Sequence, residues 1–189
     1  DAGRAERVLI KLGTLLRESL RDDGLPWTSF SRELDFVRTY LEIEEVRFGD
    51  RLVVGFNIEP RTQAAKVPPM FLQPLTENAV KHGIAHTPSP GKIEVKSRLE
   101  DGRVVLEIHD SGPGWVTAPR NGGPPGSEPP GNVSPGSEPP GNGVGVSNVL
   151  SRLDGMFDGD FSFLKRESPL GGALVSVSFP FVDVAEVAT

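Results

Sequence analysis

The sequence contains no cysteine among its 189 residues. This absence excludes disulfide bonds, thiolate metal sites and a cysteine nucleophile. The sequence also has no apolar run long enough to span a bilayer and no visible signal peptide. The net charge of -6 and the lack of a Lys/Arg cluster argue against nucleic acid as the main partner. Hydrophobic residues, at 37%, are numerous enough for a packed core, so we expect one globular domain with an appendage.

Two amphipathic helices are predicted at the N-terminus. Apolar residues recur at steps of three and four from Arg4 to Arg21, and the turn-forming stretch 22–26 ends this pattern. A second helix is predicted from Ser31, as its N-cap, to about Arg47. The hairpin has more apolar surface than two helices can bury between them, so it either packs on the following domain or pairs with a second copy in a four-helix bundle. Because the first pattern begins without a start signal, we expect the chain to be a piece of a longer protein.

Three segments of alternating apolar residues predict strands at 52–58, 93–99 and 104–110. Asp101-Gly102 is a tight-turn signal, so the second and third strands should form a hairpin. The alternation places Asp110 on the same face as apolar side chains, at the end of its strand. Because an unpartnered buried charge is costly, Asp110 should have a hydrogen-bond donor.

A helix is predicted to start near Leu72, with Pro74 in its first turn and Gly83 as the left-handed residue that ends it. Leu75 and Ala79 join Leu72 on its buried side. Its polar side carries a carboxylate, a carboxamide, an amine and an imidazole: Glu77, Asn78, Lys81 and His82. This set suits a metal with phosphates. Taken alone, however, the stretch is also typical of a solvated helix face with a Glu-Lys pair.

Two glycine loops strengthen the case for a ligand. The loop 111–114 directly follows Asp110 and lets a backbone approach a ligand closely. The second, Gly143-Val144-Gly145, opens a helix and so directs backbone N–H groups at an anion. Asn78 offers an oxygen to magnesium and Lys81 a positive charge to phosphate oxygens. An inward Asp110 carboxylate would accept from the exocyclic amine of adenine.

The stretch 117–142 is of low complexity, since one Pro/Gly-rich octapeptide occurs in it twice, and we expect a mobile loop or linker there. Two strands close the pattern, around 161–163 and 175–179, with Gly171-Gly172 between them. The order of elements predicts an α+β fold, in which an antiparallel or mixed sheet is covered on one face by helices.

Together these motifs resemble the catalytic part of a sensor histidine kinase of the LytS/YehU type, within the GHKL ATPase superfamily. The resemblance rests on five groups of residues: Tyr40–Glu44 with Arg47-Phe48, Pro68–Gly83, Asp110–Gly114, Gly143–Val149 with Arg152-Leu153, and Gly171-Gly172. It implies a Bergerat two-layer α/β sandwich with an N-terminal helical hairpin. The implied domains are a partial dimerisation and phosphotransfer region at 1–48, an ATP-binding catalytic domain at 49–182 with a lid insert at 117–142, and a tail at 183–189.

The resemblance also implies a role for each polar residue. Glu77 would be catalytic, polarising the acceptor or a water, and Asn78 would bind Mg2+ between the phosphates of ATP. ATP would be contacted by Asn78, Lys81, His82, Asp110, Gly112, Gly114, Gly143, Gly145, Asn148 and Arg152. The implied partners are a second copy through the N-terminal helices, the acceptor-histidine helix of the full-length kinase and a response regulator, with no nucleic acid. The chain would be a cytoplasmic domain of a membrane-anchored sensor.

The chain departs from the family pattern at three points. The acceptor motif, of Asn-Pro-His-Phe-Leu-Phe-Asn type, is not contained in it, so the γ-phosphoryl group of ATP would pass to a histidine outside this chain. The insert replaces the usual lid, and Ala173 stands where relatives often have threonine. Two alternatives stay open: a GHKL ATPase of another branch, and a degenerate nucleotide-binding or dimerisation module without kinase activity.

Overall fold

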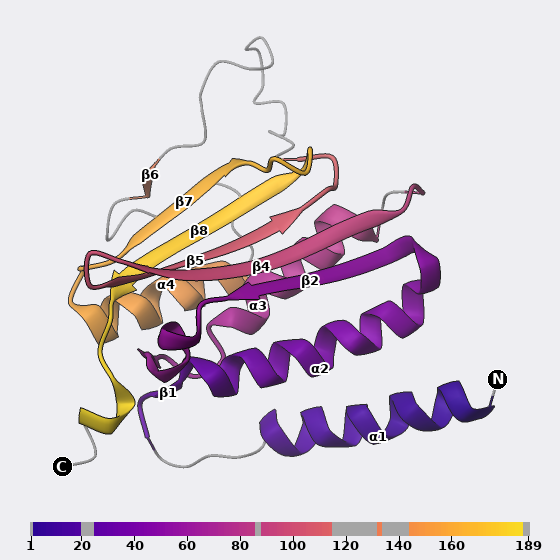
Figure 1. Ribbon diagram of the computed structural model, residues 1–189, viewed down its shortest axis with the longest axis horizontal. Helices are drawn as coiled ribbons and strands as arrows, with labels where there is room; N and C mark the ends of the chain where they lie inside the picture. The colour runs from indigo at the N-terminus through magenta and orange to yellow at the C-terminus, as the bar shows by residue number, and fades with distance from the viewer. Residues whose placement is uncertain (1, 20–24, 86–87, 115–131, 134–143, 187–189) are drawn as a thin grey trace, which may run out of the picture.

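The computed structural model describes residues 2–19, 25–85, 88–114, 132–133 and 144–186 (Figure 1). Its longer helices are α1 (Ala2–Ser19), α2 (Phe30–Phe48), α3 (Leu72–Asn78) and α4 (Val144–Phe157). Its strands are β1 (Thr28–Ser29), β2 (Leu52–Ile58), β3 (Lys66–Val67), β4 (Gly91–Glu100), β5 (Arg103–Asp110), β6 (Asn132–Val133), β7 (Ser162–Glu167) and β8 (Ala173–Pro180). Short 3-10 helices lie at Gly49–Arg51, Pro60–Ala64 and Val184–Glu186, and a π-helical turn at Ala79–Ile84 follows α3 directly.

A six-stranded mixed sheet organises the fold, in the order β2-β4-β5-β8-β7-β6. Only the β2–β4 pair is parallel among these described strands; the other neighbours are antiparallel. Strands β4 and β5 are joined at Asp101-Gly102, where both residues are left-handed, with φ of 48° and 75°. The predicted hairpin is therefore confirmed. Figure 1 shows α3 and α4 behind the sheet, α2 along β2, and α1 on the outer side of α2.

The two faces of the sheet differ in chemistry. The face toward the helices buries apolar side chains from β4, β5, β7 and β8: Ile93, Val95, Val104, Leu106, Ile108, Phe163, Val177 and Phe179. The opposite face carries ion pairs, in which Glu94 binds Lys92 at 2.5 Å and Lys96 at 2.8 Å. Hydrogen bonds from Lys92 and then Lys96 lower the pKa of Glu94 to about 2. This division confirms the α+β prediction of a sheet covered by helices on one face.

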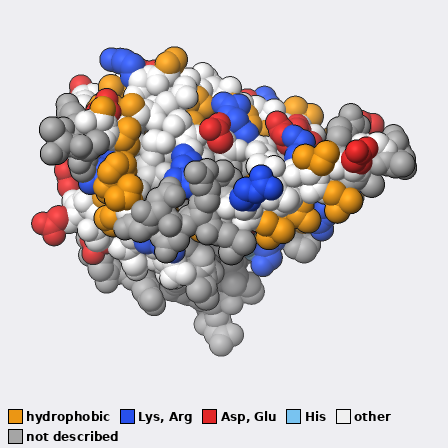
Figure 2. Space-filling view, turned by 90° about the horizontal axis from the view of Figure 1, so that it is seen from below, with side chains coloured by type: hydrophobic (Ala, Val, Ile, Leu, Met, Phe, Trp, Pro, Cys, Tyr) orange, Lys and Arg blue, Asp and Glu red, His pale blue; other side chains and the backbone are white. Residues whose placement is uncertain are grey.

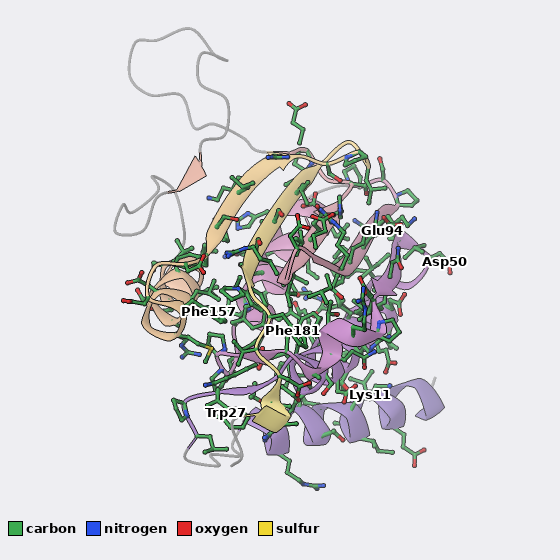
Figure 3. All side chains as sticks on the ribbon, turned by 60° about the vertical axis from the view of Figure 1, so that its left-hand side comes forward. Lys11, Trp27, Asp50, Glu94, Phe157 and Phe181 are labelled. Atoms are coloured by element: carbon green, nitrogen blue, oxygen red, sulfur yellow. The ribbon has the colours of Figure 1, made fainter. Side chains whose placement is uncertain are left out.

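Four phenylalanines join the three inner helices to the sheet. Phe71, next to α3, lies 6.4 Å from Phe30 of α2 and 6.0 Å from Phe179 of β8, measured between ring centroids. Phe157 of α4 stacks on Phe179 at 5.1 Å, and Figure 3 shows Phe157 on that helix. Such aromatic pairs contribute about 0.5–1.5 kcal/mol each beyond the burial of their area. The cluster thereby fixes where α3 starts relative to the other elements.

Helix α2 begins two residues before its predicted start. Ser29, not Ser31, is the N-cap, because its side chain accepts from the N–H of Arg32 at 3.3 Å. Ser29 is extended because β1 pairs with β3, a contact between segments far apart in the sequence. The buried side of α2, including Leu34 and Val37, belongs to the core of the following domain. The interpretation that the hairpin packs on this domain is therefore confirmed for α2.

Helix α1 packs on α2 but keeps apolar side chains in solvent. An ion pair between Lys11 and Glu42 joins the two helices, and Figure 3 shows Lys11 on the side of α1 that faces α2. Exposed apolar residues of α1 include Leu9, at 67%, and Ile10, at 64%. Figure 2 shows hydrophobic side chains at the surface on this side of the molecule. Within the described residues, no helix is both long enough and apolar enough to cross a membrane.

Most of the predicted insert, 117–142, lies outside the described residues. Its residues Asn132 and Val133 form β6, which pairs with Leu164 and Phe163 of β7 at the edge of the sheet. The predicted division of the chain at residues 48 and 182 stays a prediction.

Candidate functional site

The predicted polar helix is an α-helix that widens into a π-helical turn. Helix α3 ends at Asn78, and the turn Ala79–Ile84 continues it. Gly83 lies buried inside this turn and is not among the left-handed glycines, so the prediction that it ends the helix in that conformation is wrong. Its physical role is packing, because a Cβ on Gly83 would lie 2.7 Å from the carboxylate carbon of Asp110. Single π-turns of this kind occur frequently at functional sites.

The predicted division of this helix into two sides is confirmed. Leu72, Leu75 and Ala79 are buried, whereas Glu77, Lys81 and His82 are exposed and Asn78 is half-buried. Glu77 accepts a hydrogen bond of 2.6 Å from the side-chain nitrogen of Gln73. Glu77 and Lys81 are both described and form no ion pair, so the solvated face of the alternative interpretation is present without its Glu-Lys pair.

Asp110 lies at the end of β5 with 5% of its surface exposed. One oxygen, Oδ1, accepts from the backbone N–H of Gly112 at 2.8 Å and of Ala173 at 3.1 Å. The expectation that this carboxylate has donors is confirmed. Burial raises the pKa of Asp110, although the two hydrogen bonds and the nearby imidazoles of His109 and His82 act in the opposite direction.

Three glycines from different segments surround this carboxylate. A Cβ on Gly172 would collide with Oδ1 of Asp110 and with the nitrogen of Gly112. A Cβ on Gly112 would in turn collide with the backbone of Gly83. The π-turn, the loop after β5 and the loop before β8 therefore meet through backbone contact around one buried charge. Gly114 follows in the left-handed conformation, with φ of 77°.

Helix α4 brings further predicted residues to the start of α3. A Cβ on Gly145 would lie 3.3 Å from the Cβ of Pro74, so the first turns of α4 and α3 pack together. Asn148 is exposed. Arg152 donates to the carbonyl oxygen of Pro69 at 2.5 Å, in the loop before α3. Gly143 lies outside the described residues.

The described contacts thus bring Asp110, Gly112 and the His82 side of the π-turn together, with Gly145 beside α3. Arg152 contacts Pro69 rather than another predicted site residue. Sequence reasoning counted Gly171-Gly172 among the family motifs and Ala173 among the departures near the base, but it did not predict that Gly172 packs on Asp110 or that the N–H of Ala173 donates to it.

Sequence reasoning also missed Glu33 of α2, which accepts from the backbone at the start of α3. A signal for it existed: Glu33 lies three residues after Phe30 and four before Val37, both fully buried, so a charged side chain stands on the apolar stripe of its helix.

Comparison with protein families and known proteins agrees with this geometry. Residues 68–183 match the family described as histidine kinase-, DNA gyrase B-, and HSP90-like ATPase, and residues 1–52 match the family described as histidine kinase. The sensor protein LytS of Staphylococcus saprophyticus is 31% identical over 98% of this chain and 30% of its own length. The sensor histidine kinase BtsS of Escherichia coli is 32% identical over 59% of this chain and 20% of its own length. The chain thus spans less than a third of these relatives.

A solved structure shows the same fold. The histidine kinase domain of a blue-light-activated histidine kinase from Erythrobacter litoralis superposes with a TM-score of 0.55 at 14% identity, covering 94% of this chain and 75% of its own. The comparisons confirm the resemblance to sensor histidine kinases and the Bergerat-type two-layer fold with its N-terminal hairpin.

The glycine contacts around Asp110 predict a steric effect on stability. Gly172→Ala should lower the free energy of unfolding by about 1–3 kcal/mol, because the added methyl group meets a backbone nitrogen and a held carboxylate rather than a flexible side chain. Gly155→Ala in α4 is the matched control, because a Cβ there meets nothing within 4 Å and alanine favours a helix by up to about 1 kcal/mol. Urea unfolding of both variants checks this. Equal midpoints for Gly172→Ala and the unmodified chain would contradict the packing described.

Proposed function

Because the chain belongs to the histidine kinase-, DNA gyrase B-, and HSP90-like ATPase family, we propose that it is the ATP-binding catalytic module of a two-component sensor histidine kinase. In this proposal the γ-phosphoryl group of ATP passes to a histidine outside this chain. The observation that carries the proposal is Asp110, a buried carboxylate enclosed by glycines beside the polar side of α3. A buried carboxylate next to closely approaching backbone suits a flat base with an exocyclic amine.

The residues at hand fit ATP and magnesium. Asp110 would accept from the adenine amine, with Gly112 and Gly114 beside the base and Gly143 and Gly145 at the phosphates. Asn78, half-buried on α3, would supply an oxygen ligand to Mg2+, which prefers few protein ligands together with waters and phosphate oxygens. When bound, the ion neutralises phosphate charge. The remaining polar groups would contact ATP from the π-turn after α3 and from α4: Lys81, His82, Asn148 and Arg152.

The chemistry asked of the chain is positioning and charge stabilisation. An imidazole nitrogen of the acceptor forms a bond to the γ-phosphorus while the bond to the bridging oxygen of ADP breaks, and ADP keeps that electron pair. Glu77, exposed on α3, would accept the proton of the acceptor imidazole or polarise it. Lys81, four residues further along and also exposed, would balance charge on the departing phosphate oxygens.

The partners follow from the helical part of the chain. Exposed apolar side chains on α1, among them Leu9 and Ile10, support pairing with a second copy through the N-terminal helices. We assign residues 1–48 to the dimerisation and phosphotransfer region, 49–182 to the catalytic domain with its lid insert, and 183–189 to a tail. The longer protein would supply the acceptor helix, pass the phosphoryl group to a response regulator and place this module on the cytoplasmic side of a membrane.

A transfer assay tests the proposal directly. When the chain is mixed with a separate acceptor-helix polypeptide and γ-labelled ATP, we expect acid-labile label on the histidine of that polypeptide. Phosphate release without a labelled polypeptide would indicate an ATPase of another branch. Tight ATP binding with neither product would indicate a degenerate nucleotide-binding module.

Removing the proposed metal ligand should weaken ATP binding in the presence of Mg2+ but not metal-free ATP binding. Asn78→Ala should lower the affinity for ATP in the presence of Mg2+ by about 10- to 100-fold, the scale of lost metal-site interactions, and leave metal-free ATP binding nearly unchanged. Calorimetric titration with and without Mg2+ measures both values. Asn57→Ala, at an exposed position of β2, is the control and should change neither. Retention of the full magnesium effect in Asn78→Ala would refute the ligand role.

Neutralising the buried carboxylate should relax base selection. Asp110→Asn should reduce the preference for ATP over GTP by about tenfold, because one hydrogen bond to a charged group is weakened and an amide can also donate. Competition titrations give the ratio. Asp101→Asn, in the exposed β4–β5 turn, serves as control. If Asp110→Asn discriminates as well as the unmodified chain, the adenine assignment is wrong.

A further inference from the structure

The start of α3 is held by a carboxylate from another helix. Glu33 of α2 is 7% exposed, and its two oxygens accept from the backbone N–H of Met70 at 2.7 Å and of Leu72 at 3.1 Å. The residue at the N-cap position of α3, Phe71, makes no side-chain capping hydrogen bond. The first N–H groups of a helix lack partners within it. Glu33 therefore supplies an acceptor to the first N–H of α3, that of Leu72, and to the N–H of Met70 in the preceding loop, across 39 and 37 residues of sequence.

The loop that receives this carboxylate has an uncommon backbone. Pro68 and Pro69 have no N–H to donate, and Met70 adopts the left-handed conformation with φ of 55°. A non-glycine residue in this region is held there by its surroundings. Two side chains hold the loop: Glu33 from α2 and Arg152 from α4, which donates to the carbonyl oxygen of Pro69.

Burial dominates the environment of the Glu33 carboxylate. Loss of solvent raises its pKa, while hydrogen bonds from the backbone and the positive charge of Arg152 act in the opposite direction. Burial of this carboxylate on the apolar stripe of α2 costs solvation free energy. The hydrogen bonds that it accepts from the loop and from α3 offset that cost. Leucine at this position would bury more apolar area but would leave the N–H groups of Met70 and Leu72 without acceptors.

The charge of Glu77, near the end of α3, also acts on a residue of α2. Tyr40, two turns after Glu33, is half-buried, and its pKa is raised by burial and then by the charges of Glu44 and Glu77. Glu77 precedes Asn78. Helix α2 thus contacts α3 and also carries a residue that is influenced by the charge beside the proposed magnesium ligand.

We propose that Glu33 is a positioning residue, which fixes α3 to α2 and thereby sets the placement of Asn78 for Mg2+ and ATP. This inference rests on the proposed function. Displacement of α2 would then be transmitted to the nucleotide site through a hydrogen-bonded junction as well as through packing. The Asp110 carboxylate takes its hydrogen bonds from Gly112 and Ala173, so it depends on this junction less directly, through packing against Gly83.

The test compares two glutamates of α2 that both accept from the backbone. Glu33→Gln keeps the size of the side chain but places an amide group against one of the two N–H donors. Glu45→Gln is the matched control, since Glu45 accepts from the N–H of Val54 at 3.1 Å at the opposite end of the helix. We expect Glu33→Gln to lose about tenfold in affinity for ATP with Mg2+ and less than twofold without it. Glu45→Gln should change neither value by more than twofold.

Hydrogen exchange of the unmodified chain gives a second, independent readout. Coupling between two sites is reciprocal, so binding of ATP with Mg2+ should slow exchange of the Met70 and Leu72 amides several-fold. Metal-free ATP should slow them less. This measurement decides the matter if Glu33→Gln does not fold.

The two proposals fail in different ways. If the unmodified chain does not bind ATP with Mg2+, the proposed function falls and this inference with it. If it binds but Glu33→Gln retains the full magnesium effect, or the two amides exchange equally with and without the ligand, only the positioning role is overturned.

Discussion

A single buried carboxylate constrains how three segments of this chain pack together. Asp110 ends β5 on the apolar face of the sheet, where an ionised group needs donors. The chain supplies them from backbone, through the N–H groups of Gly112 and Ala173. Gly83, Gly112 and Gly172 surround the carboxylate, where an added Cβ would meet the carboxylate itself or the backbone of a neighbouring segment. These glycines are therefore required by the packing around the carboxylate.

Helix α3 is the second constraint, because it carries the polar groups of the site on a short and widened helix. Seven residues of α-helix have little stability of their own in water. Its position comes from outside: Phe71 packs between Phe30 and Phe179, and Glu33 accepts from the first N–H of α3 and from that of Met70 in the loop before it. The helical hairpin is therefore structurally divided. Helix α2 belongs to the core that positions α3, whereas α1 keeps an apolar surface in solvent.

Local patterns in the sequence were sufficient for most elements. Alternation of apolar residues predicts β2, β4 and β5, and Asp101-Gly102 predicts the turn between β4 and β5. Both signals depend only on neighbouring residues. The predictions that were wrong involve distant contacts. Ser29 rather than Ser31 caps α2 because β1 pairs with β3. Gly83 is not a left-handed helix end, because the helix continues through it as a π-turn, and its missing Cβ leaves room for Asp110 of β5.

The sequence by itself therefore determined the kinds of elements, the inward direction of Asp110 and the polar side of α3, since period and residue type decide these within a few residues. The tertiary structure alone decided the parallel pairing of β2 with β4, the enclosure of Asp110 by three glycines and the capping of α3 by Glu33. Each of these joins segments tens of residues apart. Such contacts follow from which surfaces exclude water together. Local spacing can mark a residue such as Glu33 as unusual, but it does not identify the distant partner.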